Sequence, residues 1–134
     1  MSDATPTIRE ATSADIRFVH SSWFSSLWSA WGRGRINRKV YEQGQDARIS
    51  RLLKSSAVTV AYFPQVPDEV LGWSCVQGDA LHYVYVKGIY RKMGIARGLV
   101  EGRVRCYTQR VEAKEGRALV SALKLEYNPY KLEQ

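Results

Sequence analysis

The 134 residues suit a single domain spanning residues 1–134, and a 45% hydrophobic and 25% charged share excludes a collagen-like, low-complexity or largely disordered chain. Twenty Lys and Arg against thirteen Asp and Glu give a net charge of +7, which indicates either a generally positive surface or an anionic partner such as nucleic acid or a phosphate-bearing cofactor. No apolar run approaches the ~20 residues of a membrane span and no signal peptide is evident, so we expect a cytoplasmic protein without membrane contact. Two cysteines are too few for a closed zinc site, so we expect no metal.

The first part of the chain predicts one short strand and two helices. Residues 5–9 are extended in character, and Thr12 or Ser13 then provides an N-cap. Apolar residues at spacings of three and four predict a helix over about 13–30, which Gly32 and Gly34 terminate. A second helix is expected over about 37–54, with a poorer apolar stripe.

Three strands are predicted next, over 57–63, 70–77 and 81–86. Their residues are rich in β-branched and aromatic side chains, and the connections between them are short turns. These features predict an antiparallel meander. Strict alternation in the third strand would place Leu81 with Tyr83 and Tyr85 on one face, and His82 with Val84 and Val86 on the other.

The remainder predicts a helix with a stripe from Ile95 to Val104, a strand over about 105–110, a helix over about 111–124, and a last strand or extended tail over about 125–130. The order of elements is therefore β-α-α-β-β-β-α-β-α-β. This alternation is typical of the α/β class with a mixed sheet.

One segment, residues 84–96, combines a strand, a basic glycine-bearing loop and a helix start. The first turn of a helix leaves backbone N–H groups unpaired, and the helix dipole favours negative charge there. Gly94 lets the backbone approach a phosphate closely because it has no Cβ. Arg91, Lys92 and Arg97 add positive charge at the same point, so the segment is predicted to be a phosphate cradle.

This segment resembles the cofactor loop of the GNAT N-acetyltransferases, whose pattern is Arg/Gln-x-x-Gly-x-Gly/Ala after a strand. Here the pattern reads Arg91-Lys92-Met93-Gly94-Ile95-Ala96. Val86 and the pair Tyr90-Arg91 also fit the family's common form, although Gly88 stands where a proline is usual. The predicted elements fit over the whole chain, so the resemblance implies a GNAT-like mixed, mostly antiparallel sheet flanked by helices.

The resemblance implies acetyl-CoA as cofactor and direct transfer of its acetyl group to a primary amine of an unidentified acceptor, either a small molecule or a protein lysine or N-terminus. Backbone amides from Lys92 to Ala96 would hold the pyrophosphate. The backbone of Tyr85 and Val86 would pair with the pantetheine arm, in a cleft where two strands separate. The full set of cofactor-binding candidates is Tyr85, Val86, Arg91, Lys92, Met93, Gly94, Ile95, Ala96 and Arg97.

Proton transfer in such a reaction calls for a base and an acid. The position of the family's base makes His82 the candidate, with a packed, hydrogen-bonded histidine as the alternative, while Asp79 is most simply a turn residue. Many family members carry the acid as a tyrosine in the last helix, but residues 111–124 contain none and Ser121 lies near that place. Tyr107 and Tyr127 are the remaining acid candidates, together with the more distant Tyr130.

In this fold the first two helices and their connection wall the acceptor site. That connection contains Trp31, Arg33 and Arg35, which we predict to bind the acceptor. An arginine-bearing rim favours an acidic acceptor and repels polyamines. The early C-terminal end resembles short GNAT-like proteins of tailed phages and implies that a final strand is missing. Many family members pair through that edge, so a homodimer is one candidate assembly and the mode of pairing stays open.

Two other functions remain open from the sequence. A basic surface with aromatic residues near arginines could bind nucleic acid, although no standard nucleic-acid motif is present. A GNAT-like protein could also bind the cofactor with little turnover, since the helix tyrosine is missing. The response of binding to salt separates the first alternative from an acetyltransferase, and turnover with an acceptor separates the second.

Overall fold

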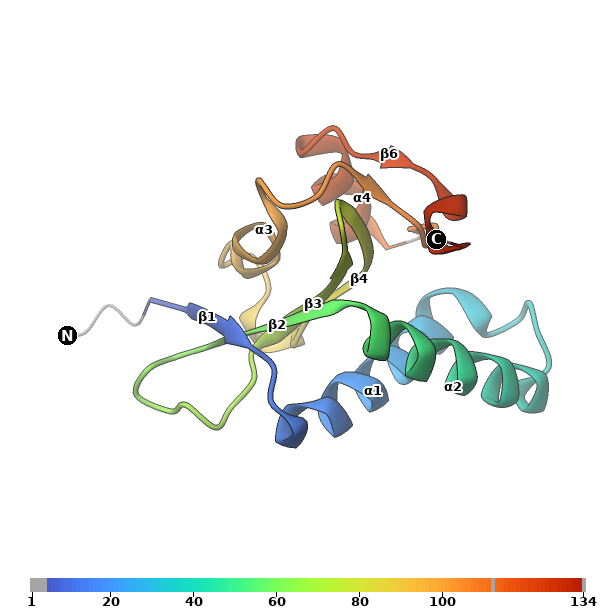
Figure 1. Cartoon of the computed structure of the whole chain (residues 1–134), viewed down its shortest axis with the longest axis horizontal. Coiled ribbons are helices and arrows are strands. Elements are labelled where there is room, and N and C mark those ends of the chain that lie inside the picture. Colours follow the sequence, from blue (N-terminus) through green and yellow to red (C-terminus); the bar gives the residue numbers. More distant parts are fainter. Residues whose placement is uncertain (1–4, 112, 134) are drawn as a thin grey trace.

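The computed structural model describes residues 5–111 and 113–133, and its six strands form one sheet in the order β1-β2-β3-β4-β5-β6 (Figure 1). Neighbouring strands from β1 to β4 are antiparallel, whereas β4-β5 and β5-β6 are parallel. The predicted mixed, mostly antiparallel α/β fold and its element order are confirmed. The elements are β1 (Thr7–Glu10), α1 (Ser13–Leu27), α2 (Arg38–Ser55), β2 (Ala57–Tyr62), β3 (Gly72–Gln77), β4 (Ala80–Val86), α3 (Ile95–Val100), β5 (Cys106–Tyr107), α4 (Lys114–Ala122) and β6 (Glu126–Tyr127), with short 3-10 turns at Gly88–Tyr90 and Pro129–Glu133.

Helix α1 begins where the sequence predicts, with Thr12 as its N-cap. The Thr12 backbone N–H donates to the Asp15 carboxylate at 2.7 Å, and Arg9 pairs with the same carboxylate at 2.7 Å. The Arg9 hydrogen bond lowers the pKa of Asp15 despite its burial. After Leu27 the chain continues in a π-helical turn to Gly32, where a Cβ would lie 2.7 Å from the Trp28 ring. Only glycine fits this turn without moving the tryptophan.

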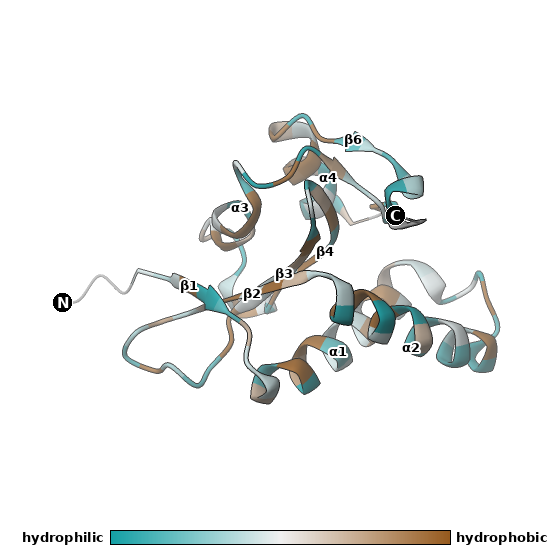
Figure 2. Cartoon of the chain, viewed as in Figure 1, coloured by the Kyte–Doolittle hydropathy of each residue, from teal (hydrophilic) through white to brown (hydrophobic). Residues whose placement is uncertain are grey.

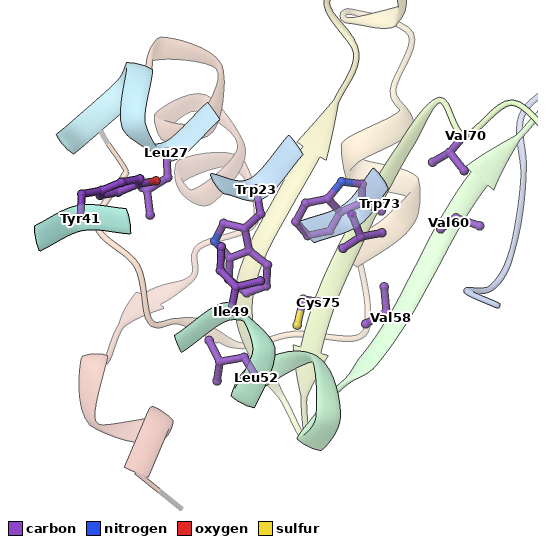
Figure 3. Close-up of a cluster of buried hydrophobic side chains, with 11 residues drawn as sticks. Trp23, Leu27, Tyr41, Ile49, Leu52, Val58, Val60, Val70, Trp73 and Cys75 are labelled. Carbon is purple, nitrogen blue, oxygen red and sulfur yellow. The ribbon is translucent and has the colours of Figure 1, made fainter. Parts of the chain in front are cut away.

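Helices α1 and α2 cover one face of the sheet, and their contact with it forms the larger apolar cluster (Figures 1 and 3). Trp23 of α1 and Trp73 of β3 are almost fully buried, with ring centroids 5.5 Å apart. The Trp73 indole N–H donates to the Ser22 hydroxyl at 2.8 Å, so the polar atom that this large side chain carries inward is satisfied. Colouring by hydropathy shows the brown strands β3 and β4 at the centre of the molecule (Figure 2).

Helix α3 covers the other face, where Ile95 and Leu99 pack with Ala61, Leu71 and Leu81. The prediction that Leu81 shares a face with Tyr83 and Tyr85 is wrong, because those tyrosines pack on the α1–α2 side. The register explains the difference: Cys75 pairs with Tyr83 but Val76 pairs with Leu81, so His82 is an extra, bulged residue. A bulge reverses the alternation on its two sides.

The C-terminal elements are shorter than predicted. Helix α3 ends at Val100, and the strand expected over 105–110 has only two paired residues, Cys106 and Tyr107. Strand β6 is likewise a two-residue strand followed by a 3-10 turn. In the part of the chain that the structure describes, no helix has the length and apolarity to cross a membrane, and no three potential metal-ligating side chains gather.

Candidate functional site

A groove of about 510 Å³ opens where β4 and β5 separate. The two strands pair only through Ala80↔Cys106 and Leu81↔Tyr107, while β4 continues to Val86 without a partner on that side. The loop after β4 and helices α3 and α4 provide the other walls, and Trp31 also lines the groove. A volume of this size is typical of small-molecule and cofactor sites.

Strand β4 turns toward this groove backbone groups that no neighbouring strand pairs with. The Lys87 N–H donates to the Leu71 carbonyl at 2.9 Å, so the backbone groups of Tyr85 point toward β3 and those of Val84 and Val86 point away from it. The Val86 carbonyl accepts a hydrogen bond from Arg91 Nε at 3.3 Å. Both predicted residues line the groove, but only Val86 turns its backbone groups toward it, because the backbone groups of Tyr85 point to β3. Sequence reasoning missed Val84, which the alternation of the strand would have indicated.

The loop after β4 forms a bend with free amides. Lys92 and Gly94 both have left-handed backbone angles, with φ of 68° and 78°. Within the described ranges, the amides from Lys92 to Ala96 donate no backbone hydrogen bond, and the first bond of α3 runs from the Gly98 N–H to the Gly94 carbonyl at 2.9 Å. A Cβ on Gly94 would meet no protein atom. Such a concave run of unpaired N–H groups is an anion-binding arrangement.

The predicted cofactor residues lie together around this loop, and all of them except the half-exposed Met93 line the groove. Two of the cations are already paired: Arg91 lies 3.6 Å from Glu115 of α4, and Arg97 lies 3.0 Å from Glu101. Glu115 also lines the groove. The loop therefore carries positive charge that solvent-exposed carboxylates partly offset.

Several solved structures of acetyltransferases share this arrangement of elements. An inferred acetyl transferase of Pyrococcus furiosus superposes with a TM-score of 0.63 at 19% identity, over 90% of this chain and 91% of that one. An aminoglycoside N-acetyltransferase in complex with CoA matches with a TM-score of 0.56 at 15% identity, over 95% of this chain and 91% of its own. A GCN5-related N-acetyltransferase of Rhodopseudomonas palustris matches with a TM-score of 0.52 at 16% identity, over 75% and 64%.

The chain has the GNAT N-acetyltransferase fold. No protein-family model and no curated protein matches the sequence, so the resemblance drawn from the Arg91–Ala96 pattern is confirmed by the fold and not by sequence similarity. The pattern stands at the same place in the GNAT-like architecture as expected, between the last strand of the meander and the helix that covers the sheet.

His82, the candidate base of the GNAT-like site, is buried at the bulge of β4 with 1% of its surface exposed. Nδ1 lies 2.8 Å from the Thr108 hydroxyl and Nε2 lies 2.9 Å from the Gln77 side-chain oxygen. Burial, and secondly the positive charge of Arg48, lowers the pKa of His82 to about 4. With both ring nitrogens bonded and the ring neutral at pH 7, these surroundings favour the packed, hydrogen-bonded histidine.

The rings of the two candidate acids contact each other in a tilted arrangement, with centroids 5.3 Å apart and an interplanar angle of 42°. Tyr107 of β5 is half-buried and lines the groove, whereas Tyr127 of β6 is 43% exposed and lines a neighbouring cavity. Tyr83 also lines the groove, and its hydroxyl lies 2.8 Å from the Ser26 hydroxyl. Burial raises the pKa of Tyr83.

The predicted acceptor residues separate in the structure. Trp31 lines both the groove and the neighbouring cavity, but Arg33 and Arg35 are exposed and line neither. The neighbouring cavity measures about 430 Å³ and contains Gln45, Arg48 and Arg110, none of which the sequence pattern singled out. A buried Gln and a half-buried Arg three residues apart on a helix with a weak apolar stripe are the signal that could have indicated it.

Proposed function

We propose that this protein transfers an acetyl group from acetyl-CoA to a primary amine. The observation that carries the proposal is the run of free amides from Lys92 to Ala96 at the end of a groove along an unpaired strand edge. Those amides would bind the pyrophosphate of the cofactor, and the backbone groups of Val84 and Val86 would pair with its amide-bearing arm. The aminoglycoside N-acetyltransferase in complex with CoA, which shares this fold, supports the assignment.

Acetyl-CoA would supply a thioester carbonyl that the amine attacks, so that an N–C bond forms as the C–S bond breaks. Trp31 lines both the groove and the neighbouring cavity, so an amine bound in that cavity would be held next to the thioester in the groove. The proton displaced from the amine would leave to water, since both nitrogens of His82 are already bonded.

Tyr107 is the residue that we assign as the acid. It lines the groove at the point where β4 and β5 separate, and in the described chain its hydroxyl forms no hydrogen bond with another residue. A phenol there would give its proton to the departing sulfur and regain it from solvent. Tyr127 would position the ring of Tyr107 and would not touch the reacting atoms, because it lies outside the groove.

Thermal unfolding with and without acetyl-CoA tests the cofactor assignment. We expect the wild type to gain about 2.7 kcal/mol at a cofactor concentration one hundred times Kd, and Gly94→Glu to lose that gain because its carboxylate would enter the cradle. Gly102→Glu is the matched control, since Gly102 also has a left-handed φ, of 80°, and open space for a side chain, but lies outside the groove.

Hydrogen exchange on the wild type provides a second measurement if Gly94→Glu fails to fold. Acetyl-CoA should protect the amides of residues 92–96 more than any other loop. No stabilisation at millimolar acetyl-CoA, or protection elsewhere, would overturn the proposal. Stabilisation that is retained in Gly94→Glu would show that the cofactor binds at another place.

A further inference from the structure

The cavity beside the groove has an unusual chemical composition. Its walls come from the π-helical turn that follows α1, from α2, from the segment after β5 and from the C-terminal segment that begins with β6. It shares Trp31, Gln109 and Arg110 with the groove, so the two spaces adjoin. Two guanidinium groups, those of Arg48 and Arg110, line it, and none of its lining residues is acidic.

Polar groups in this cavity are desolvated without having a partner. The Gln45 side chain is 8% exposed and its Nε2 forms no hydrogen bond. Arg48 donates one bond from Nη1 to Gln109 Oε1 at 3.1 Å, but its Nε is buried and unbonded. Among the residues that the structure describes, no carboxylate forms an ion pair with Arg48 or Arg110.

Burial of such groups is unfavourable unless something binds them. An unsatisfied buried donor costs roughly 1–3 kcal/mol, and a charged group costs more. Burial, and secondly the charge of Arg51, lowers the pKa of Arg48, which reflects the same unfavourable environment. Gln45 and Arg48 lie three residues apart on one face of α2 and line the same cavity, so an amide N–H and a guanidinium N–H face one space.

We infer that this cavity binds the carboxylate of the acceptor, and that the acceptor is a small amine carrying a carboxylate, of the size of an amino acid. The inference rests on the proposed acetyl transfer and specifies its substrate class. Arg48 and Gln45 would each donate to one carboxylate oxygen, and the amine would then extend toward Trp31 and the groove. The acidic preference expected from Arg33 and Arg35 is thus assigned to different residues. Two uncompensated guanidinium groups would repel polyamines.

Matched acceptors with and without the carboxylate test this inference. The pairs are lysine with cadaverine and tyrosine with tyramine, and phosphoethanolamine is included as a different anion. With wild-type protein and acetyl-CoA, we expect kcat/KM to be at least tenfold higher for the carboxylate member of each pair. Arg48→Gln should lower kcat/KM for that member by roughly tenfold to a hundredfold, the range of a charge-assisted hydrogen bond, and leave the decarboxylated member unchanged.

Lys54→Gln is the control, because Lys54 is an exposed cation on the same helix, lines neither space and is not among the charges that act on Arg48. It should leave the selectivity intact. Calorimetry of amino acid binding without cofactor gives a readout apart from turnover, and the affinity should fall in Arg48→Gln but not in Lys54→Gln.

The outcomes separate the inference from the function on which it rests. If acetyl-CoA stabilises the protein but both members of each pair react equally, the carboxylate site is wrong and the acetyltransferase stands. If acetyl-CoA does not bind while amino acids still bind through Arg48, the proposed function is wrong and the site stands. A preference for phosphoethanolamine, or a loss of acetyl-CoA binding in Arg48→Gln, would overturn the inference.

Discussion

The two halves of the sheet differ in how completely their groups are satisfied. Strands β1 to β4 pair along most of their length, interrupted by the bulge at His82, and α1 and α2 bury large aromatic and aliphatic side chains against them. By contrast, β5 and β6 each have only two paired residues, and α4 has no fully buried residue. The first half thus provides a rigid scaffold. The second half leaves a strand edge and a run of amides free for a ligand, at the expense of its own packing.

Equal truncations in the two halves should have unequal effects. Leu52 of α2 is 2% exposed, so Leu52→Ala should lower the free energy of unfolding by roughly 2–5 kcal/mol. Leu119 of α4 is half-buried at the groove, so Leu119→Ala should cost about 1 kcal/mol. Urea denaturation of both variants measures the difference. Equal losses would mean that α4 is as much a part of the scaffold as α2.

The same contrast explains which parts of the fold could be predicted. The meander follows from local signals, namely β-branched runs separated by short turns, and the predicted Thr12 cap of α1 lies where the sequence places it. The bulge at His82 could not be predicted, because a register shift depends on how β4 meets its partner β3. It is this shift that moved Leu81 to the α3 face.

The candidate site divides in the same way. The cradle from Arg91 to Ala96 is a contiguous segment, so its glycine and basic residues reveal it in the sequence. The carboxylate-binding cavity joins Gln45 and Arg48 to Gln109 and Arg110, which are some sixty residues away along the chain. No local spacing carries that information, and only the contact between α2 and the segment after β5 produces it.

His82 connects the two halves, because its ring bonds Thr108 after β5 and Gln77 of β3. Burial lowers its pKa to about 4, while the unfolded chain takes up the proton near pH 6.5. Between these values the unfolded state holds more protons, so the free energy of unfolding should decrease as the pH falls from 6.5 to 4, by up to about 3 kcal/mol. Above pH 6.5 His82 is neutral in both states, so the free energy of unfolding keeps the full contribution of its buried ring.

Urea denaturation at several pH values between 4 and 8 measures this loss. Buried carboxylate pairs such as Asp15 with Arg9 also lose stability in acid, so the comparison is between wild type and His82→Gln. The variant should be less stable at pH 7.5 and should show a smaller decrease between pH 6.5 and 4. Identical pH dependence in the two proteins would mean that His82 has nearly the same pKa in the folded and unfolded states.

Tyr107 and Tyr127 contact each other, but only Tyr107 lines the groove, so the two residues should differ in their effect on the reaction. Tyr107→Phe should lower kcat by roughly a hundredfold if its phenol protonates the departing thiolate. Tyr127→Phe should change kcat little, because Tyr127 lines the neighbouring cavity and not the groove. Single-turnover rates and acetyl-CoA affinity, measured side by side, check that Tyr107→Phe affects the chemical step. A loss confined to KM would assign Tyr107 to binding.

The smallest expected effect concerns the negative charge of Glu115, which lies on α4 and lines the same groove as the cradle. Glu115 pairs with Arg91 at 3.6 Å, and both side chains are about half-exposed. Its carboxylate should repel the phosphates of acetyl-CoA and compete for the Arg91 guanidinium. Glu115→Gln should therefore tighten acetyl-CoA binding a few-fold at low salt, and the gain should disappear near 1 M salt, where the Debye length is about 3 Å.

Glu42→Gln is the control for this last effect, because Glu42 forms a comparable exposed pair with Arg38 on α2, away from the groove. Calorimetric titration at two salt concentrations distinguishes the variants. A gain in Glu115→Gln alone would place the cofactor phosphates within reach of α4, so that the loosely packed helix helps to set the affinity. Weaker binding in Glu115→Gln would instead mean that its pair with Arg91 holds the loop in the shape that presents the amides.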